Sequence, residues 1–98
     1  MQAVIRTYSG KGSKELFDLL EQRKADVESV MRPIKGFVSY AGARSGDGGF
    51  TVTVCQDKAG TEESVRLAKE WISKNGAGIS VDAPKVSWGS TIIHAAKQ

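Results

Sequence analysis

The chain has 98 residues, of which 40% are hydrophobic and 26% are charged, and its formal net charge at pH 7 is +3. This composition is ordinary for one soluble globular domain with a single core. The basic residues are scattered among acidic ones, so no basic stripe indicates a nucleic-acid-binding surface. The first residues contain no long apolar run, so we expect neither a signal peptide nor a membrane span. A lone cysteine excludes an internal disulfide, and together these features favour a cytoplasmic protein.

The first half of the chain predicts a strand, a long helix and a second strand. Residues 3–8 are β-prone and are followed by a Ser-Gly pair. From Ser13, a candidate N-cap, apolar residues recur at helical spacing up to Met31, which predicts one long amphipathic helix. Pro33 should end this helix, because the residue before a proline is disfavoured in the helical conformation. Residues 34–43 predict the second strand, and a polar, glycine-rich turn follows it.

The second half predicts a strand, a helix and a last strand. The strand over residues 48–57 carries no charge in its centre, which indicates an interior position in the sheet. Bulky apolar residues alternate in it with small ones: Phe50, Thr51, Val52, Thr53, Val54 and Cys55. A second helix should open at residues 60–61, with glutamates in its first turn, and close at residues 75–76 through positive φ. A loose loop then leads to a last strand over residues 86–95.

The order of these elements predicts a ferredoxin-like α+β fold. A βαββαβ chain with right-handed crossovers gives a four-stranded antiparallel sheet, with both helices on one face and with the first and third strands in its centre. The other face of the sheet would then be bare, and it would carry apolar or small residues. Such a face requires a partner, most simply a second copy of the chain. We therefore expect a homodimer formed through the open sheet face.

Four stretches carry a likeness to a known family: residues 4–9 with the Gly-Lys-Gly-Ser turn, residues 36–40, residues 47–50, and the helix end at residues 70–72. Together they resemble the dimeric α+β barrel superfamily, which includes antibiotic-biosynthesis monooxygenase-like proteins. The resemblance implies a dimer whose sheets face each other, and a ligand cleft between sheet and helices in each subunit. It also implies binding, oxidation or isomerisation of a small organic molecule, with no tightly held cofactor.

The chain departs from that family at the positions that carry catalysis. The oxygenases tend to use an asparagine on the first strand with a tryptophan from the helical region, and the haem enzymes add a histidine. Here the first strand offers Arg6 and Thr7, and the only histidine, His94, follows on the last predicted strand. Trp71 alone does not rebuild the set, so no catalytic residue is carried over. The alternative interpretation is therefore a dimeric binding module without catalytic activity.

Aromatic and polar side chains supply the material for a mainly apolar pocket. We expect its lining to include Arg6, Tyr8, Phe37, Tyr40 and Trp71. The candidates for catalysis are Tyr40 and His94, because His94 is the one side chain that titrates near neutrality. The simpler interpretation of His94 is a strand-end or interface residue.

Other candidate sites compete with structural explanations. The glycine-rich turn with Lys11 and Ser13 could bind an anion at a helix start, or could be only a tight turn with an N-cap. Cys55 is expected to be an inert packing residue. No second histidine or cysteine-rich spacing exists, so we expect no metal site. The RNA-recognition motif shares this topology, but Val52 and Cys55 stand where its aromatics belong, so we expect no nucleic-acid partner.

Overall fold

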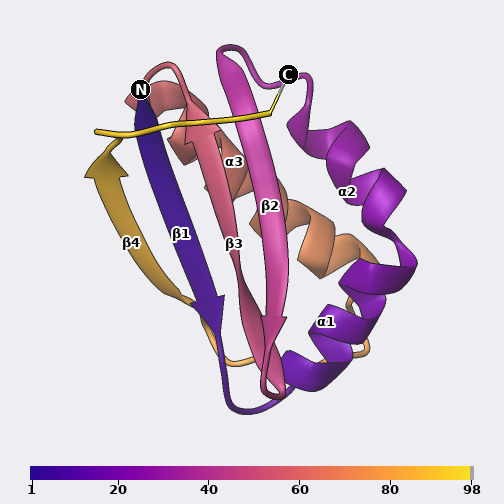
Figure 1. The fold of residues 1–98 in the computed structure, drawn as a ribbon. Helices are drawn as coiled ribbons and strands as arrows, with labels where there is room; N and C mark the ends of the chain where they lie inside the picture. The colour runs from indigo at the N-terminus through magenta and orange to yellow at the C-terminus, as the bar shows by residue number, and fades with distance from the viewer. Residues whose placement is uncertain (98) are drawn as a thin grey trace.

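The computed structural model describes residues 1–97. Its elements are β1 (Gln2–Tyr8), α1 (Ser13–Gln22), α2 (Lys24–Met31), β2 (Phe37–Ser45), β3 (Gly48–Cys55), α3 (Lys58–Asn75) and β4 (Lys85–Ser90). The strands form one antiparallel sheet in the order β2-β3-β1-β4, and the helices cover one of its faces (Figure 1). The ferredoxin-like fold and the central positions of β1 and β3 are thus confirmed. None of the helices in this part of the chain combines the length and apolar character needed to cross a membrane.

The first helical region is two helices, so the prediction of one long helix was wrong. The break lies at Arg23, whose φ of −114° and ψ of 27° are not helical. The apolar stripe continues across it, since Leu16 before the break and Val27 after it are both buried. Arg23 pairs with Asp26, and its guanidinium carbon lies 5.9 Å from the ring centroid of Trp71 on α3. Neither proline nor glycine marks this break in the sequence, so helical spacing alone could not locate it.

The strand after the helices begins later than expected. The prediction started this strand at residue 34, whereas β2 starts at Phe37. The chain first makes two turns, in which the Ile34 amide donates to the Met31 carbonyl at 3.2 Å and the Phe37 amide donates to the Ile34 carbonyl at 3.0 Å. Helix α2 does end shortly before Pro33. However, Arg32 keeps helical angles, with φ −57° and ψ −37°, so the proline does not expel it from that conformation.

The ends of α3 also differ from the prediction. The helix begins before residues 60–61, because the Asp57 side chain caps it by accepting a hydrogen bond of 3.1 Å from the Gly60 amide. At the other end, Gly76 has a φ of −109°, so the expected positive φ is not used there.

The start of α1 depends on a glycine. Gly12 caps the helix with a φ of 78°, and Ser13, the expected cap, is instead the first helical residue. A left-handed backbone of this kind favours glycine. In addition, a Cβ added to Gly12 would lie 2.2 Å from the carbonyl oxygen of Ser80. Position 12 is therefore restricted to glycine by both its backbone angle and its surroundings.

We expect Gly12→Ala to lower the free energy of unfolding by more than the ~1–2 kcal/mol that a left-handed backbone costs a non-glycine residue. Gly46→Ala is the matched control, since Gly46 has a φ of 60° but nothing within 4 Å of an added Cβ. Urea denaturation measures both losses. Equal losses in the two variants would contradict the predicted clash at Ser80.

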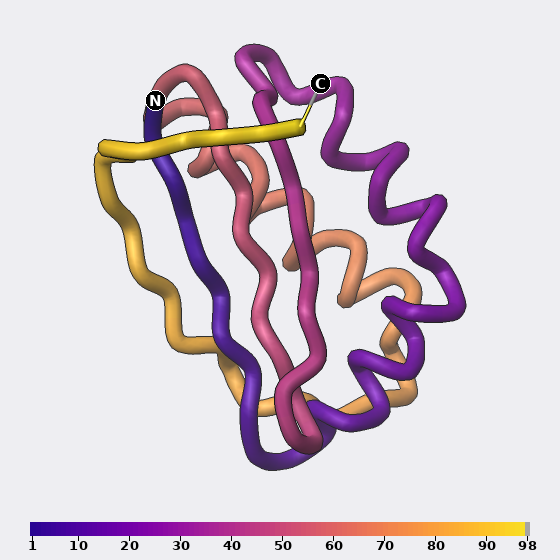
Figure 2. The backbone as a smooth tube through the Cα atoms, in the orientation of Figure 1, coloured from indigo at the N-terminus to yellow at the C-terminus, as the bar shows by residue number. Residues whose placement is uncertain are grey.

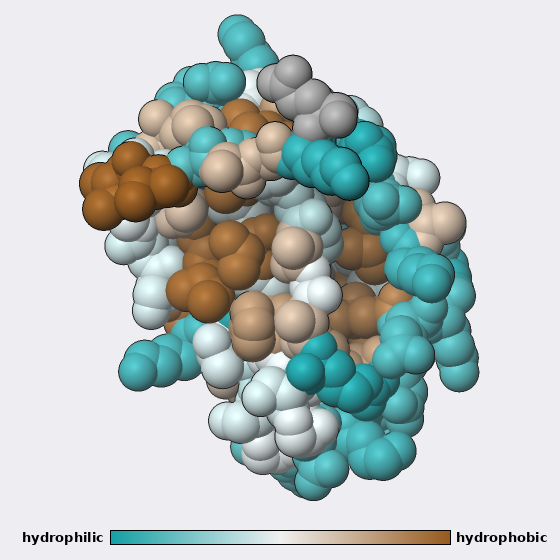
Figure 3. Space-filling view, viewed as in Figure 1, coloured by the Kyte–Doolittle hydropathy of each residue, from teal (hydrophilic) through white to brown (hydrophobic). Residues whose placement is uncertain are grey.

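The register of the strands assigns the two faces of the sheet. Directly opposed residues of antiparallel strands share a face. Arg6 on β1 opposes Thr51 on β3, and both are buried beneath the helices. On the other face Ile5, Val52 and Ala41 stand side by side across β1, β3 and β2, and they are partly or fully exposed. Figure 3 looks onto this open face, where apolar surface gathers over the central strands.

Residues 91–97 leave the sheet and cross its open face at one end (Figures 1 and 2). The last strand was expected to run to residue 95, but it ends at Ser90 because Ser90 already opposes Gln2, the first residue of β1. No further β1 backbone remains there to pair with. The Thr91 amide instead donates to the Met1 carbonyl at 3.0 Å.

Candidate functional site

A cleft opens between the helices and the covered face of the sheet. Its outer part has a volume of about 360 Å³ and is lined by α1, α2, β2 and β3. Its inner end has a volume of about 20 Å³ and reaches β1 and α3. The two parts adjoin, because both are lined by Leu20, Val27, Tyr40 and Thr51.

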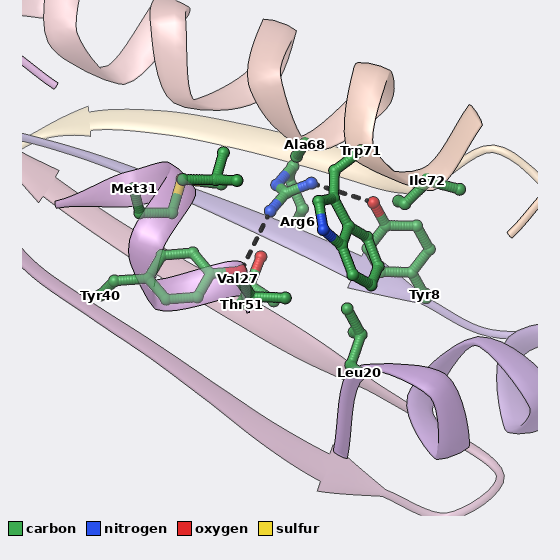
Figure 4. Close-up of a pocket in the computed structure, with 11 residues that line it drawn as sticks. Arg6, Tyr8, Leu20, Val27, Met31, Tyr40, Thr51, Ala68, Trp71 and Ile72 are labelled. Carbon is green, nitrogen blue, oxygen red and sulfur yellow. Dashed lines mark hydrogen bonds between the residues drawn. The ribbon is translucent and has the colours of Figure 1, made fainter. Parts of the chain in front are cut away.

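The inner end combines apolar walls with a polar floor. The helices supply most of the apolar walls: Leu20, Val27, Val30, Met31, Ala68 and Ile72. The sheet supplies Arg6, with Tyr8 on one side of it and Tyr40 on the other, and Trp71 extends from α3 beside them (Figure 4). A mainly apolar pocket with a few converging polar groups is the usual form of a small-molecule site.

Arg6 lies at the centre of this floor and is only 3% exposed. Its Nη1 donates to Tyr8 Oη at 3.1 Å, and its Nη2 donates to Tyr40 Oη at 3.4 Å. No ion pair within residues 1–97 includes Arg6, and its Nε and the nearby Thr51 Oγ1 find no hydrogen-bond partner among the described protein atoms. A buried charge is normally paired, because its removal from water costs several kcal/mol. The site therefore holds a positive charge that the fold itself does not neutralise.

A β-bulge turns Tyr40 toward this site. The register between β2 and β3 shifts between Phe37, which opposes Cys55, and Ser39, which opposes Val54. Since side chains alternate along a strand, this extra residue moves Tyr40 onto the covered face, where regular alternation from Phe37 would have placed it on the open one.

Burial raises the pKa of the Tyr8 hydroxyl above its ordinary value of 10.0, and the adjacent Arg6 charge opposes part of that rise. The neutral phenol is therefore the form that the fold favours. Because the folded pKa is raised, the stability that Tyr8 contributes is complete below pH 10 and is lost as pH rises through the folded pKa.

We expect the titration midpoint of Tyr8 to lie above pH 10 in a Tyr40→Phe variant, where Tyr8 is the one remaining tyrosine, because burial, the largest cause of the raised pKa, is retained. Adding Arg6→Met should raise that midpoint further, because the guanidinium lowers the pKa of Tyr8. Ultraviolet titration of the two variants measures both values. A lower midpoint without Arg6 would contradict the contact between the two side chains.

The structure brings four of the five predicted pocket residues together: Arg6, Tyr8, Tyr40 and Trp71 line the inner end. Phe37 lies outside this lining and packs against the core cluster that contains Cys55. The two catalytic candidates are separated. Tyr40 faces the cleft, whereas His94 lies in the segment that crosses the open face, with its Nε2 3.3 Å from Ser39 Oγ.

The glycine-rich turn before α1 contacts an acid from its own chain. The Lys11 amide donates to Asp82 Oδ2 at 3.1 Å, and the Asp82 amide donates to the Lys11 carbonyl at 3.0 Å. The Ser13 hydroxyl lies 2.8 Å from the Gly10 carbonyl, to which it donates. These contacts fit the simpler interpretation of a tight turn, and anion binding at Lys11 and Ser13 stays a prediction.

Sequence reasoning missed Thr51 as part of the site. The alternation along its strand showed a hydroxylated face but gave no indication that this face lies beneath the helices. The residues of the helices that line the cleft were predicted only as parts of an apolar stripe, and not as parts of a site.

Cys55, also on the covered face, is fully buried, and burial raises the pKa of its thiol, which is typical of an inert packing residue. No group of three or more potential metal ligands occurs within residues 1–97.

No protein-family model matches the sequence, and no curated protein matches it. Solved structures do match. A protein of unknown function from Nitrosomonas europaea, NE2512, has a TM-score of 0.72 at 16% identity, over 99% of this chain and 94% of that one. A dimeric ferredoxin-like protein from an uncultured marine organism has a TM-score of 0.65 at 11% identity, over 98% and 96%. SnoaB, a cofactor-independent oxygenase from Streptomyces nogalater, has a TM-score of 0.60 at 15% identity, over 98% and 96%.

At these identities the shared property is the fold. The predicted resemblance is confirmed for the fold, which these three proteins, one of them described as dimeric and ferredoxin-like, share over nearly the whole chain. Similar structures include both an oxygenase and a protein of unknown function, so the fold alone assigns no activity.

Proposed function

We propose that the protein binds a small, largely apolar organic molecule in the cleft between its helices and its sheet. The observation that carries this proposal is the continuity of the cleft, which leads from an outer space of about 360 Å³ to a polar inner end at Arg6. Apolar walls provide the affinity for a ligand body, and the few polar groups fix its orientation.

The functional unit that we propose is a homodimer in which two open sheet faces meet. Ile5, Val52 and Ala41 form an apolar row at the centre of that face. Burial of apolar area stabilises such an association, and one self-complementary face is enough for a two-fold dimer. The dimeric description of the similar marine protein supports this arrangement.

The reaction class that we propose is oxidation of the bound molecule without a tightly held cofactor, in line with the oxygenase among the similar structures. In a balanced reaction of this kind, molecular oxygen converts a CH₂ group into a carbonyl and releases one water, so the substrate supplies all the electrons. Tyr40 is the catalytic candidate that lines the cleft. Oxygen uptake with an enolisable ketone such as 1,3-indanedione tests this step, and binding without uptake would favour the non-enzymatic binding module.

We expect Gly42→Val to weaken binding of the neutral probe 4-nitroanisole by about tenfold, because the added side chain extends into the outer cleft, which Gly42 lines. Its Cβ would meet Thr51 Cγ2 at 3.7 Å, an ordinary contact, and valine suits a strand, so the fold should persist. Binding is measured by quenching of Trp71 fluorescence in a Trp88→Phe background, which leaves Trp71 as the only tryptophan.

Gly78→Val is the matched control for this experiment, since Gly78 lies in the loop after α3 with nothing within 4 Å of an added Cβ. It should leave the affinity unchanged. Unaltered quenching in Gly42→Val, or no quenching in the parent protein, would contradict the placement of the ligand in the cleft.

A further inference from the structure

We infer that the ligand is an acid, and that Arg6 binds its negatively charged oxygen group, a carboxylate or a phenolate, while its apolar body occupies the outer cleft. This inference rests on the proposed function, because it identifies the class of molecule that the cleft takes.

The charge of the site is unbalanced without a ligand. An arginine keeps its positive charge inside proteins and offers five N–H donors in a planar fork. Two donors of Arg6 are used, by Tyr8 and Tyr40, and both acceptors are neutral hydroxyls. The Arg6 Nε has no partner among the described atoms. An oxyanion would supply the missing charge and accept short, charge-assisted hydrogen bonds.

Further hydrogen-bond donors lie at the same place as Arg6. The Thr51 hydroxyl lines the inner end and has no partner among the described atoms. Each tyrosine hydroxyl accepts from Arg6 with its oxygen and retains its own proton to donate. Burial keeps Tyr8 in this protonated form, since it raises the pKa of the hydroxyl. A site with one fixed cation and several hydroxyl donors is complementary to an anionic oxygen.

The space beside Arg6 limits the size of the group that can bind there. The inner end, at about 20 Å³, holds roughly one water-sized group. It therefore accommodates one anionic oxygen beside Arg6, with the rest of a carboxylate or phenolate extending toward the outer cleft, but not a bulky head group such as a phosphate ester. The body of the ligand must lie in the adjoining outer cleft, whose volume is about 360 Å³.

The acids near the cleft pair with cations other than Arg6. Glu21, which lines the outer cleft, and Asp18 both pair with Arg44, at 3.2 and 3.0 Å. Glu28, which also lines the cleft, pairs with Arg32.

Arg44 lines the outer cleft with its charge already neutralised, whereas Arg6 is deeper and has no acidic partner within the described chain. Lys24 also lines the outer cleft and is in none of the ion pairs within residues 1–97, but it is exposed, so water screens its charge. An entering anion is thus expected to pass Arg44 and Lys24 and to bind at the buried Arg6.

Calorimetric titration with two matched pairs of probes tests the inference. Benzoate and benzamide have nearly the same shape but differ in charge, and 4-nitrophenolate and 4-nitrotoluene form the corresponding phenolate pair. We expect at least one anion to bind wild-type protein about tenfold or more tightly than its neutral counterpart. The arm with the larger ratio identifies the head group as a carboxylate or a phenolate.

Variants separate a ligand contact from a structural role. Arg6→Met and Arg6→Gln should bring the anion-to-neutral ratio close to one while neutral probes still bind, and Arg6→Lys should retain part of the preference. Equal binding of both members of each pair by wild-type protein would overturn the inference and leave the proposed binding function intact. Loss of the preference in Arg44→Gln, with Arg6 unchanged, would overturn it as well. Failure of all four probes to bind would contradict the proposed function itself.

Discussion

A glutamate in place of Val52 is expected to convert the proposed dimer into monomers. Val52 lies on β3, a central strand, between Ile5 and Ala41 on the open face. Two-fold symmetry would bring both new carboxylates into the interface. An unpaired buried charge costs roughly 3–5 kcal/mol, and about 1.4 kcal/mol changes a dissociation constant tenfold. The dissociation constant should therefore rise by roughly a thousandfold or more, as measured by sedimentation equilibrium.

The Val52→Glu monomer should remain folded, because the new side chain would face water once the partner has left. Ser73→Glu is the matched control: it adds the same charge at an exposed position on α3, on the helical side of the molecule, and should leave the mass unchanged. A wild-type protein that is monomeric at micromolar concentration would contradict the dimer. So would a Val52→Glu variant that stays dimeric.

The architecture could be predicted from the sequence because its signals are local and agree with one another. The uncharged strand at residues 50–55 indicated a central position, and β3 is central. The details that failed depend on tertiary contacts. The break at Arg23 is associated with a contact to Trp71 on another helix. The last strand, β4, ends where it has no further β1 residue to pair with. Neither event leaves a proline, glycine or periodicity signal at the position concerned.

The candidate site could be predicted in composition but not in arrangement. Arg6, Tyr8, Tyr40 and Trp71 were expected in a pocket, and all four line the inner end of the cleft. That Arg6 is the centre of the site could not be inferred, because a sequence does not show whether an arginine is buried or which acids it meets. The orientation of Tyr40 depends on a β-bulge, which no pattern in the sequence indicated.

Replacement of Arg6 by methionine is expected to raise the free energy of unfolding of the ligand-free protein by about 1–4 kcal/mol. Proteins are often more stable when a buried charged group is replaced by an apolar side chain of similar size, because the apolar side chain has no charge to desolvate. Methionine would fill the same space among Met31, Ala68 and Trp71 without a charge to desolvate. Urea denaturation at one protein concentration measures the difference. Arg66→Met is the matched control: Arg66 is exposed on α3, and its loss should change stability by only about 0.5 kcal/mol.

Saturation with an anionic probe should then reverse the order of stability. A ligand at one thousand times its dissociation constant stabilises the folded state by about 4.1 kcal/mol, which matches or exceeds the gain expected for Arg6→Met. Wild-type protein should gain this amount with benzoate or 4-nitrophenolate, whichever binds, and Arg6→Met should gain far less. If Arg6→Met is less stable than wild type without ligand, the hydrogen bonds to Tyr8 and Tyr40 outweigh the desolvation of the guanidinium. Arg6 would then be a structural residue. If Arg6→Met is instead more stable than wild type without ligand and less stable than wild type with ligand, the function of the buried charge is to bind the ligand.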